Sequence, residues 1–293
     1  MFLLKPDLVH PPQRVISLVP SMTESLFDLG CGQSVVGVTN YCSAPAQETA
    51  RLPKVGGPKD ARLDDILALR PDLVIANQEE NSKELVEALV SAGIPVWLTF
   101  PMSVRESLDD LWDLTRLLPG NNAALRLRLL EDSYRWAELG LADRPRLRYF
   151  CPIWQESASD GTLWWMTFNQ DTYSNNLLAV FGGENVFSQR KRLYPLEANW
   201  NEAAVEDLAS RDVRYPVVCA RDVLAAMPEM ILLPNEPFDF DDLPDEFWMN
   251  LFSATPAVKN RRIVHVEGSL ITWCGTRLGR ALAELPQVFL TEQ

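Results

Sequence analysis

Two segments of this chain repeat one pattern, and that repeat constrains the fold more than any other feature. Residues 63–79 read LDDILALRPDLVIANQE, and residues 220–236 read ARDVLAAMPEMILLPNE. Each begins at helical spacing, passes a proline, continues as a short apolar run and ends in polar residues. The segments SLFDLGCGQSVVGV at 25–38 and YSNNLLAVFGGENVF at 173–187 match in the same way. Two copies in one order predict two lobes of related architecture.

Strands and helices are predicted to alternate within each lobe. In the first copy RVISLVP, SVVGVT, DLVIA and PVWLTF have the length and composition of strands, and amphipathic segments separate them. Ser21 or Thr23 is the expected N-cap of the first helix. The second copy restarts at LRYFC. This alternation is typical of an α/β fold, here two Rossmann-like lobes with parallel sheets.

A single long helix is predicted to join the lobes. Its apolar residues step by three or four and form one continuous stripe: Leu127, Leu130, Tyr134, Ala137 and Leu141. We therefore divide the chain into an N-terminal lobe over 1–118, a connecting backbone helix over 119–143, and a C-terminal lobe over 144–293. A stiff helical connector predicts a small closure movement.

Polar residues follow the matched apolar runs. Asn77 and Glu79 come directly after DLVIA, and Glu236 follows the corresponding run of the second copy. Ligands bind outside the carboxyl ends of the strands in open parallel sheets. Either segment alone is compatible with a solvated loop. As a matched pair they predict two polar rims that face one ligand-binding cleft between the lobes.

Tryptophans supply the apolar part of the predicted site. Trp154, Trp164 and Trp165 follow the first strand of the second lobe. Indole rings bind large flat ligands by stacking and apolar burial. Neighbouring strand residues point to opposite faces, so Trp164 and Trp165 are not both expected in one core. Trp112 and Trp136 lie on helical stripes and are expected to pack within the protein.

Neither catalysis nor metal binding by the protein itself is predicted. The chain has two histidines, His10 and His265, whereas a transition-metal site normally needs several with carboxylates. His265 is expected in the core on the strand RIVHV. The sequence shows no G-x-S-x-G, Walker-type or H-E-x-x-H motif. We therefore expect no catalytic residues, no metal ligands, no intrinsic cofactor and no enzyme activity.

Charge and hydropathy restrict the partners. A net charge of −13 disfavours nucleic acid, and no apolar run approaches the roughly 20 residues that cross a bilayer. Lys5, Pro6 and Asp7 interrupt the N-terminal apolar stretch too early for a signal peptide. The chain as written is expected in the cytoplasm, or in the periplasm or at the cell surface if it was trimmed. We expect a monomer that binds a small molecule.

The motifs together resemble the substrate-binding proteins that deliver cobalamin and ferric siderophores to ABC importers. The resemblance covers residue 14 to about residue 290 and is carried by RVISLVPSMTESLFDLG, VVGVTNYC, LDDILALRPDLVIA, FGGENVF, YPVVCARDVLAAMPEMILLPNEP and VEGSLITWCG. The segments PIWQ and WWMTFNQDTYSNNLLAVFGG resemble the helical-backbone metal receptor branch. The resemblance implies capture of a bulky ligand that carries its own metal, cobalamin-like first and a ferric siderophore second.

The resemblance also implies further site residues. Tyr41, Tyr215 and Trp273 stand at ligand-facing positions, while Asn77 stands where the cobalamin receptor has an aromatic residue. Members of the family present one carboxylate on each lobe to the membrane permease. Asp64 matches the first of these positions. At the second position this chain has Arg221, with Asp222 adjacent.

One alternative function belongs to another class. A cytoplasmic enzyme or ligand sensor for corrinoids or tetrapyrroles could use the same fold. The lack of a recognisable leader and the reversed charge at Arg221 favour this alternative. The lack of a catalytic histidine constellation opposes it.

Overall fold

The computed structural model describes residues 5–118, 120–141, 145–209 and 211–290. Its contacts divide the chain into two units. Unit 1 comprises Met1–Tyr134 and Trp273–Gly279, and unit 2 comprises Arg135–Thr272 and Arg280–Gln293. The predicted α/β class is confirmed. The lobe boundaries predicted at 118 and 143 stay a prediction, and the contacts add that residues 273–279 pack with unit 1.

Unit 1 contains a parallel sheet with the strand order β2-β1-β3-β4. Its strands are β1 (Val15–Ser17), β2 (Val35–Val38), β3 (Leu73–Asn77) and β4 (Val96–Thr99). Val15 lies opposite both Val35 and Leu73 in the register. All residues of β1, β3 and β4 are buried, as expected of strands that helices cover on both faces.

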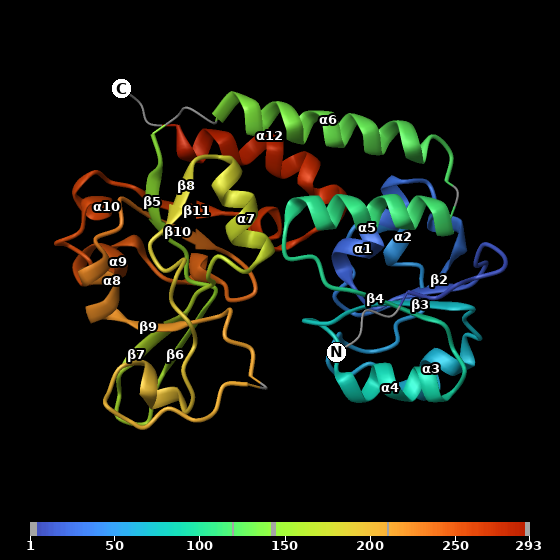
Figure 1. Ribbon diagram of the computed structural model, residues 1–293, viewed down its shortest axis with the longest axis horizontal. Helices are drawn as coiled ribbons and strands as arrows, with labels where there is room; N and C mark the ends of the chain where they lie inside the picture. The colour runs from blue at the N-terminus through green and yellow to red at the C-terminus, as the bar shows by residue number, and fades with distance from the viewer. Residues whose placement is uncertain (1–4, 119, 142–144, 210, 291–293) are drawn as a thin grey trace. The chain divides into compact units, whose positions relative to one another are not determined.

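Helices cover both faces of this sheet, with α3 and α4 on one side and α1 and α5 on the other (Figure 1). The helices of unit 1 are α1 (Pro20–Asp28), α2 (Ala46–Thr49), α3 (Leu63–Ala68), α4 (Lys83–Ser91) and α5 (Val104–Leu117), with the 3-10 turn η1 (Gly32–Ser34). The core between the sheet and α3–α4 contains Ile66 and Leu89, both fully buried. The predicted strand–helix alternation is therefore correct in this unit.

The predicted cap of α1 is wrong. The N-cap is Val19, with Pro20 as the first helical residue, so Ser21 and Thr23 lie inside the helix. The Thr23 hydroxyl oxygen lies instead within hydrogen-bond distance of the Val19 carbonyl, at 3.0 Å, and of the Ser17 hydroxyl, at 2.8 Å. Proline supplies the helical φ angle that starts the helix without a polar cap.

Unit 2 contains two sheets. The first is parallel with the order β11-β10-β5-β8, and the second is antiparallel with the order β6-β7-β9. Their strands are β5 (Leu147–Phe150), β6 (Trp154–Ser157), β7 (Leu163–Met166), β8 (Gly183–Asn185), β9 (Val217–Cys219), β10 (Met230–Pro234) and β11 (Ile263–Val266). The repeat predicted β5 and β10 correctly. It did not predict the antiparallel sheet.

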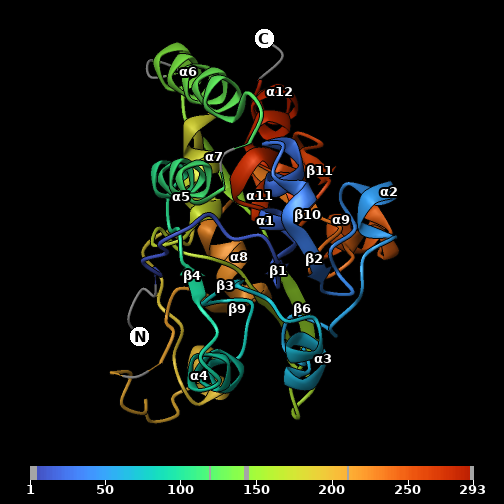
Figure 2. The same ribbon diagram turned by 90° about the vertical axis from the view of Figure 1, so that its right-hand side faces the viewer.

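Helices also flank the parallel sheet of unit 2. Figure 2 shows the same structure turned by 90°. The helices after α6 are α7 (Tyr173–Val180), α8 (Ala220–Ala226), α9 (Asp245–Leu251), α10 (Pro256–Lys259), α11 (Ser269–Thr272) and α12 (Leu278–Phe289), and the 3-10 turns in this part of the chain are η2 (Leu196–Asn199), η3 (Phe240–Asp242) and η4 (Gly275–Arg277). Of these, η4 and the first two residues of α12 belong to unit 1. The core of this unit is aromatic. It contains Phe150 of β5, Trp248 of α9 and Phe252, which is the C-cap of α9.

The predicted connecting helix is α6 (Ala123–Leu141), the long green helix of Figure 1. Leu127 and Tyr134 of the predicted stripe are buried, at 0% and 5% exposure. Trp112 on α5 donates its indole N–H to Glu131 of α6 at 3.3 Å, so it packs as expected. The expectation for Trp136 is wrong, because this side chain is 72% exposed on the opposite face of α6.

Candidate functional site

Tyr41 lies just beyond the carboxyl end of β2 and is 67% exposed. The next residue, Cys42, is buried, and its sulfur lies 3.1 Å from the hydroxyls of both Thr23 and Thr39. Burial raises the pKa of the Cys42 thiol. Cys42 is therefore a neutral anchor, and it holds the turn that presents the Tyr41 ring to solvent.

A buried amide network builds the polar rim after β3. The side-chain oxygen of Asn77 accepts from the backbone N–H of Glu79 at 2.8 Å. Asn81 accepts from the Asn77 N–H at 2.8 Å and donates to the carbonyls of Leu18 and Pro58. Asn77 is only 5% exposed. The structure thus places Asn77 in the turn rather than at a ligand surface, and the exposed side chain in the turn after β3 is Glu79.

An aromatic pair lies at the carboxyl edge of the parallel sheet in unit 2. Trp154, the first residue of β6, lies four residues beyond the end of β5 and is 41% exposed. Its ring meets Phe238, which follows β10, edge to face with centroids 5.7 Å apart. Phe238 in turn contacts the buried Phe240, with ring centroids 4.7 Å apart. Sequence reasoning missed Phe238, although it lies two residues beyond Glu236 at the polar end of the repeat.

Glu236 lies in the same edge and is partly exposed. Its backbone packs against Gly268, where an added Cβ would lie 2.5 Å from the Glu236 carbonyl. Asn235 accepts from the Gly268 N–H at 2.9 Å. Glycine at 268 is thus required for the loops after β10 and β11 to approach each other.

The antiparallel sheet buries both tryptophans that follow Trp154. Trp165 is 0% exposed, contacts Trp248 and Phe252, and donates to Gln155 at 2.7 Å. Trp164 is 5% exposed. Only one of the two was expected in a core, but β7 is the central strand of its sheet and both of its faces are covered. The structure therefore places Trp164 and Trp165 in the interior of unit 2 rather than at a ligand surface.

Arginines cover the remaining two predicted aromatics. Tyr215 of unit 2 is partly buried, and the Arg214 guanidinium lies 5.4 Å from its ring centre. Trp273 belongs to unit 1, and Arg277 lies 4.8 Å from its ring centre. Arg277 is only 7% exposed and pairs with Glu24 at 2.7 Å. Each ring therefore has one face occupied by a cation.

The two carboxylates predicted to contact a permease differ in availability. Asp64 is exposed in the first turn of α3. Asp222 is held in place instead, because it accepts from the Cys219 N–H at 2.9 Å and pairs with Arg190 at 3.0 Å. Desolvation acts to raise the pKa of Asp222, but the hydrogen bonds from Cys219 and Arg190 outweigh it and lower the pKa. The structure thus commits Asp222 to an internal cap and ion pair.

His265 lies at the surface, so its expected place in the core is wrong. Its two ring nitrogens lie 2.6 Å from Asp241 and 2.8 Å from Asp245. Desolvation acts to lower the pKa of His265, and the two carboxylates reverse this and raise it. The imidazole links β11 to η3 and α9. Among the described residues, no group of three or more histidines, cysteines or carboxylates could hold a metal ion.

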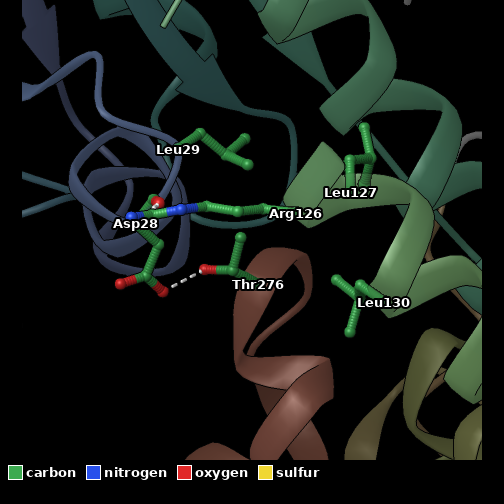
Figure 3. Close-up of a pocket in the computed structure, with 6 residues that line it drawn as sticks. All are labelled: Asp28, Leu29, Arg126, Leu127, Leu130 and Thr276. Atoms are coloured by element: carbon green, nitrogen blue, oxygen red, sulfur yellow. Dashed lines mark hydrogen bonds between the residues drawn. The ribbon is translucent and has the colours of Figure 1, made fainter. Parts of the chain in front are cut away.

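Unit 1 also contains a cavity of about 260 Å³ (Figure 3). Six residues line it: Asp28, Leu29, Arg126, Leu127, Leu130 and Thr276. The Thr276 hydroxyl donates to the Asp28 carboxylate at 2.7 Å. Asp28 ends α1, whose first residue follows β1, so the cavity lies away from the carboxyl ends of the strands. A drug-sized ligand usually needs roughly 300–1,000 Å³, so this space is small for a corrinoid.

Part of the chain matches the model of a known protein family. Residues 15–127 match the model of the periplasmic binding protein family. The resemblance of this chain to the substrate-binding proteins of that family is confirmed. No described helix is long and apolar enough to cross a membrane.

Individual relatives extend the similarity over nearly the whole chain. It is 24% identical over 288 residues to the vitamin B12-binding protein of Vibrio parahaemolyticus serotype O3:K6, which covers 96% of this chain and 90% of that protein. The fold is similar to that of the periplasmic vitamin B12 binding protein of Vibrio cholerae, with a TM-score of 0.73, 22% identity and coverage of 96% and 97%. A periplasmic heme-binding protein from Roseiflexus sp. RS-1 gives a TM-score of 0.70 at 20% identity, with coverage of 94% and 97%.

Proposed function

We propose that this chain is the substrate-binding component of an ABC-type importer and captures a bulky, flat metal chelate. A cobalamin-like corrinoid is the first candidate, and haem or a ferric siderophore is the second. The ligand brings its own metal, and the protein supplies no catalytic group and no cofactor. This assignment places the chain on the outer side of the importer, where substrate-binding proteins collect their ligands.

One observation carries this proposal: each unit presents an exposed aromatic side chain at the carboxyl edge of its parallel sheet. These are Tyr41 in unit 1 and Trp154 in unit 2, at 67% and 41% exposure. Large aromatic rings normally gain free energy by burial, so their exposure at a sheet edge favours a ligand surface. Ligands of open parallel sheets bind at this edge.

The polar groups beside these rings suit the periphery of such a ligand. Glu79 lies in the polar rim after β3 of unit 1, and Glu236 lies two residues before Phe238, whose ring contacts Trp154 in unit 2. A corrinoid carries amide side chains, and carboxylates can accept hydrogen bonds from them. A haem carries propionates, which two carboxylates would repel. We therefore rank the corrinoid above haem. That both edges face one cleft stays a prediction.

Calorimetric titration of the purified protein with cyanocobalamin, haem and a ferric siderophore tests this proposal. We expect saturable binding of cyanocobalamin and weaker or no binding of the other two. Trp154→Ala and Tyr41→Ala should each raise the dissociation constant of the preferred ligand about ten- to a hundredfold, because each removes one stacking surface.

Met249→Ala is the matched control, because Met249 is also apolar and 44% exposed in unit 2 but lies on α9. This variant should bind like the unaltered protein. Loss of affinity in one aromatic variant alone would assign the ligand to that unit. If none of the three ligands binds, the proposed ligand class is wrong, and the alternative of a sensor or enzyme on this fold gains support.

A further inference from the structure

Helix α6 carries a second apolar stripe, on the face opposite its buried one. Its exposed members are Leu125, Leu129, Trp136 and Leu139, with exposed fractions of 59%, 59%, 72% and 63%. Leu127 and Tyr134 point to the other side and are buried. All four exposed side chains lie on one unbroken helix, so the helical repeat alone fixes their spacing. We call these four residues, together with Asp132, which lies between Leu129 and Trp136 in the sequence, the α6 seam.

The spacing of the α6 seam indicates a helical partner. Positions 125, 129, 132, 136 and 139 are separated by four, three, four and three residues, as are the a and d positions of a coiled coil. Four of these five positions are apolar. Polar residues or glycine flank the row, with Arg128 and Arg135 on one side and Ser133 and Gly140 on the other. Such a narrow row is typical of a coiled-coil interface, whereas a globular core contact is wider.

Charge excludes a second copy of this chain as the best occupant. Arg128 and Arg135 are both exposed beside the α6 seam, and Asp132 is the single carboxylate within it. The surface therefore has a net positive charge. A second copy would bring the same sign of charge to the same contact, and like charges at an interface cost affinity.

A lipid surface fits less well than a protein helix. Interfacial membrane helices carry a broad apolar face, and they bind anionic headgroups through many basic residues. The α6 seam is narrow and has a carboxylate, Asp132, at its centre. The protein as a whole carries a net charge of −13, which an anionic bilayer would repel. A local positive face on an acidic protein instead favours an acidic partner.

We propose that the α6 seam docks an amphipathic helix of a partner protein. This partner helix carries apolar residues along its own seam and Asp or Glu at the flanking positions, where they meet Arg128 and Arg135. The proposed ligand capture at the sheet edges does not depend on this contact. The described part of α6 offers about two and a half heptads, so the contact is expected to be weak and reversible.

Two synthetic helical peptides of about three heptads test this proposal. Both have Leu at the seam positions, and they differ only in Glu or Lys at the flanking positions. With the full chain, we expect the Glu peptide to bind and the Lys peptide to bind about tenfold more weakly in fluorescence anisotropy. The double variant Arg128→Glu/Arg135→Glu should reverse this preference, and Leu129→Ser/Trp136→Ser should abolish binding of both peptides.

Val90→Ser is the control, because Val90 is 47% exposed on α4 and lies outside the α6 seam. This variant should bind both peptides like the unaltered chain. Equal binding of the two peptides, or binding that survives Leu129→Ser/Trp136→Ser, would overturn the proposal. Sedimentation that shows a dimer abolished by Leu129→Ser/Trp136→Ser would assign the surface to a second copy. Flotation with phosphatidylserine vesicles that depends on the same residues would assign it to lipid.

Discussion

Asp110 on α5 shows how one partly buried carboxyl limits the stability of unit 1. Burial raises the pKa of Asp110 to about 7, and the neighbouring Asp113 adds to this shift. The folded state therefore binds the proton more tightly than the unfolded chain, whose aspartate has a pKa near 3.9. The contribution of Asp110 to the free energy of unfolding is fully present below about pH 4, and it is lost as the pH rises through 7.

Replacing Asp110 by Asn should therefore stabilise the protein at pH 8. We expect the free energy of unfolding in urea to rise by roughly 1–3 kcal/mol, because the amide carries no charge to desolvate. The gain should disappear near pH 4, where the carboxyl is neutral. Asp109→Asn is the matched control on the exposed side of α5 and should change little. Equal stability of Asp110→Asn and the unaltered protein at pH 8 would refute this account.

Single residues were also the hardest to predict from the sequence. Asn77 follows a buried strand at a ligand-binding edge, but its amide is used by the local turn. Asp222 stands beside the position where the resemblance predicts a docking carboxylate, but it pairs with Arg190, which lies 32 positions earlier in the sequence. Sequence position shows which edge a side chain reaches. It does not show whether a distant partner already occupies that side chain.

At the scale of elements, the loop after β3 depends on one buried amide. Asn81 is 4% exposed and joins the Asn77 backbone to the carbonyls of Leu18 and Pro58. Asn81→Ala should lower the free energy of unfolding by about 2–3 kcal/mol, because it leaves buried backbone groups unpaired. Urea denaturation measures this change.

Asn40→Ala provides the comparison for Asn81→Ala. Asn40 is an exposed asparagine at the same edge of the sheet, directly before Tyr41. Its removal should change the free energy of unfolding by less than about 0.5 kcal/mol. A similar loss in both variants would show that the edge responds to any change of polarity, and that the buried network has no special role.

The repeat predicted the parallel strands well, because each is a short apolar run between turn residues. The antiparallel sheet was missed for a physical reason. Strand β6 reads WQES and is mostly exposed, so it lacks the burial pattern that marks a strand. Its neighbour β7 pairs in turn with β9, about fifty positions further along the chain. Pairing at such a distance leaves no local signal.

At the scale of the whole molecule, the repeat and the motifs together indicated the fold class and the family. They did not indicate that unit 1 uses two separate pieces of chain. Residues 273–279 return to it, and there Gly275 donates to Ser107 at 2.8 Å and Arg277 pairs with Glu24 at 2.7 Å. No pattern in the sequence predicts that residues 273–279 pack with unit 1, because VEGSLITWCG reads as the end of the second lobe.

A fragment of residues 1–134 should therefore fold poorly by itself. It lacks the return segment, and removal of one partner of a buried ion pair typically costs about 3–5 kcal/mol. We expect circular dichroism to show a loss of cooperative thermal unfolding. A synthetic peptide of residues 270–282 added in excess should restore it. A fragment that unfolds cooperatively without the peptide would show that the return segment is dispensable.

The position of the return segment also has a consequence for biosynthesis. Unit 1 begins with the first strand of the chain, yet its last contributing residue is Gly279. A nascent chain grows at about 5–20 residues per second, and N-terminal domains commonly fold before the rest is made. Here the N-terminal unit is complete only after residues 273–279 have left the ribosome. Unit 1 therefore cannot be completed before most of unit 2 has been made, so the two units do not mature one after the other.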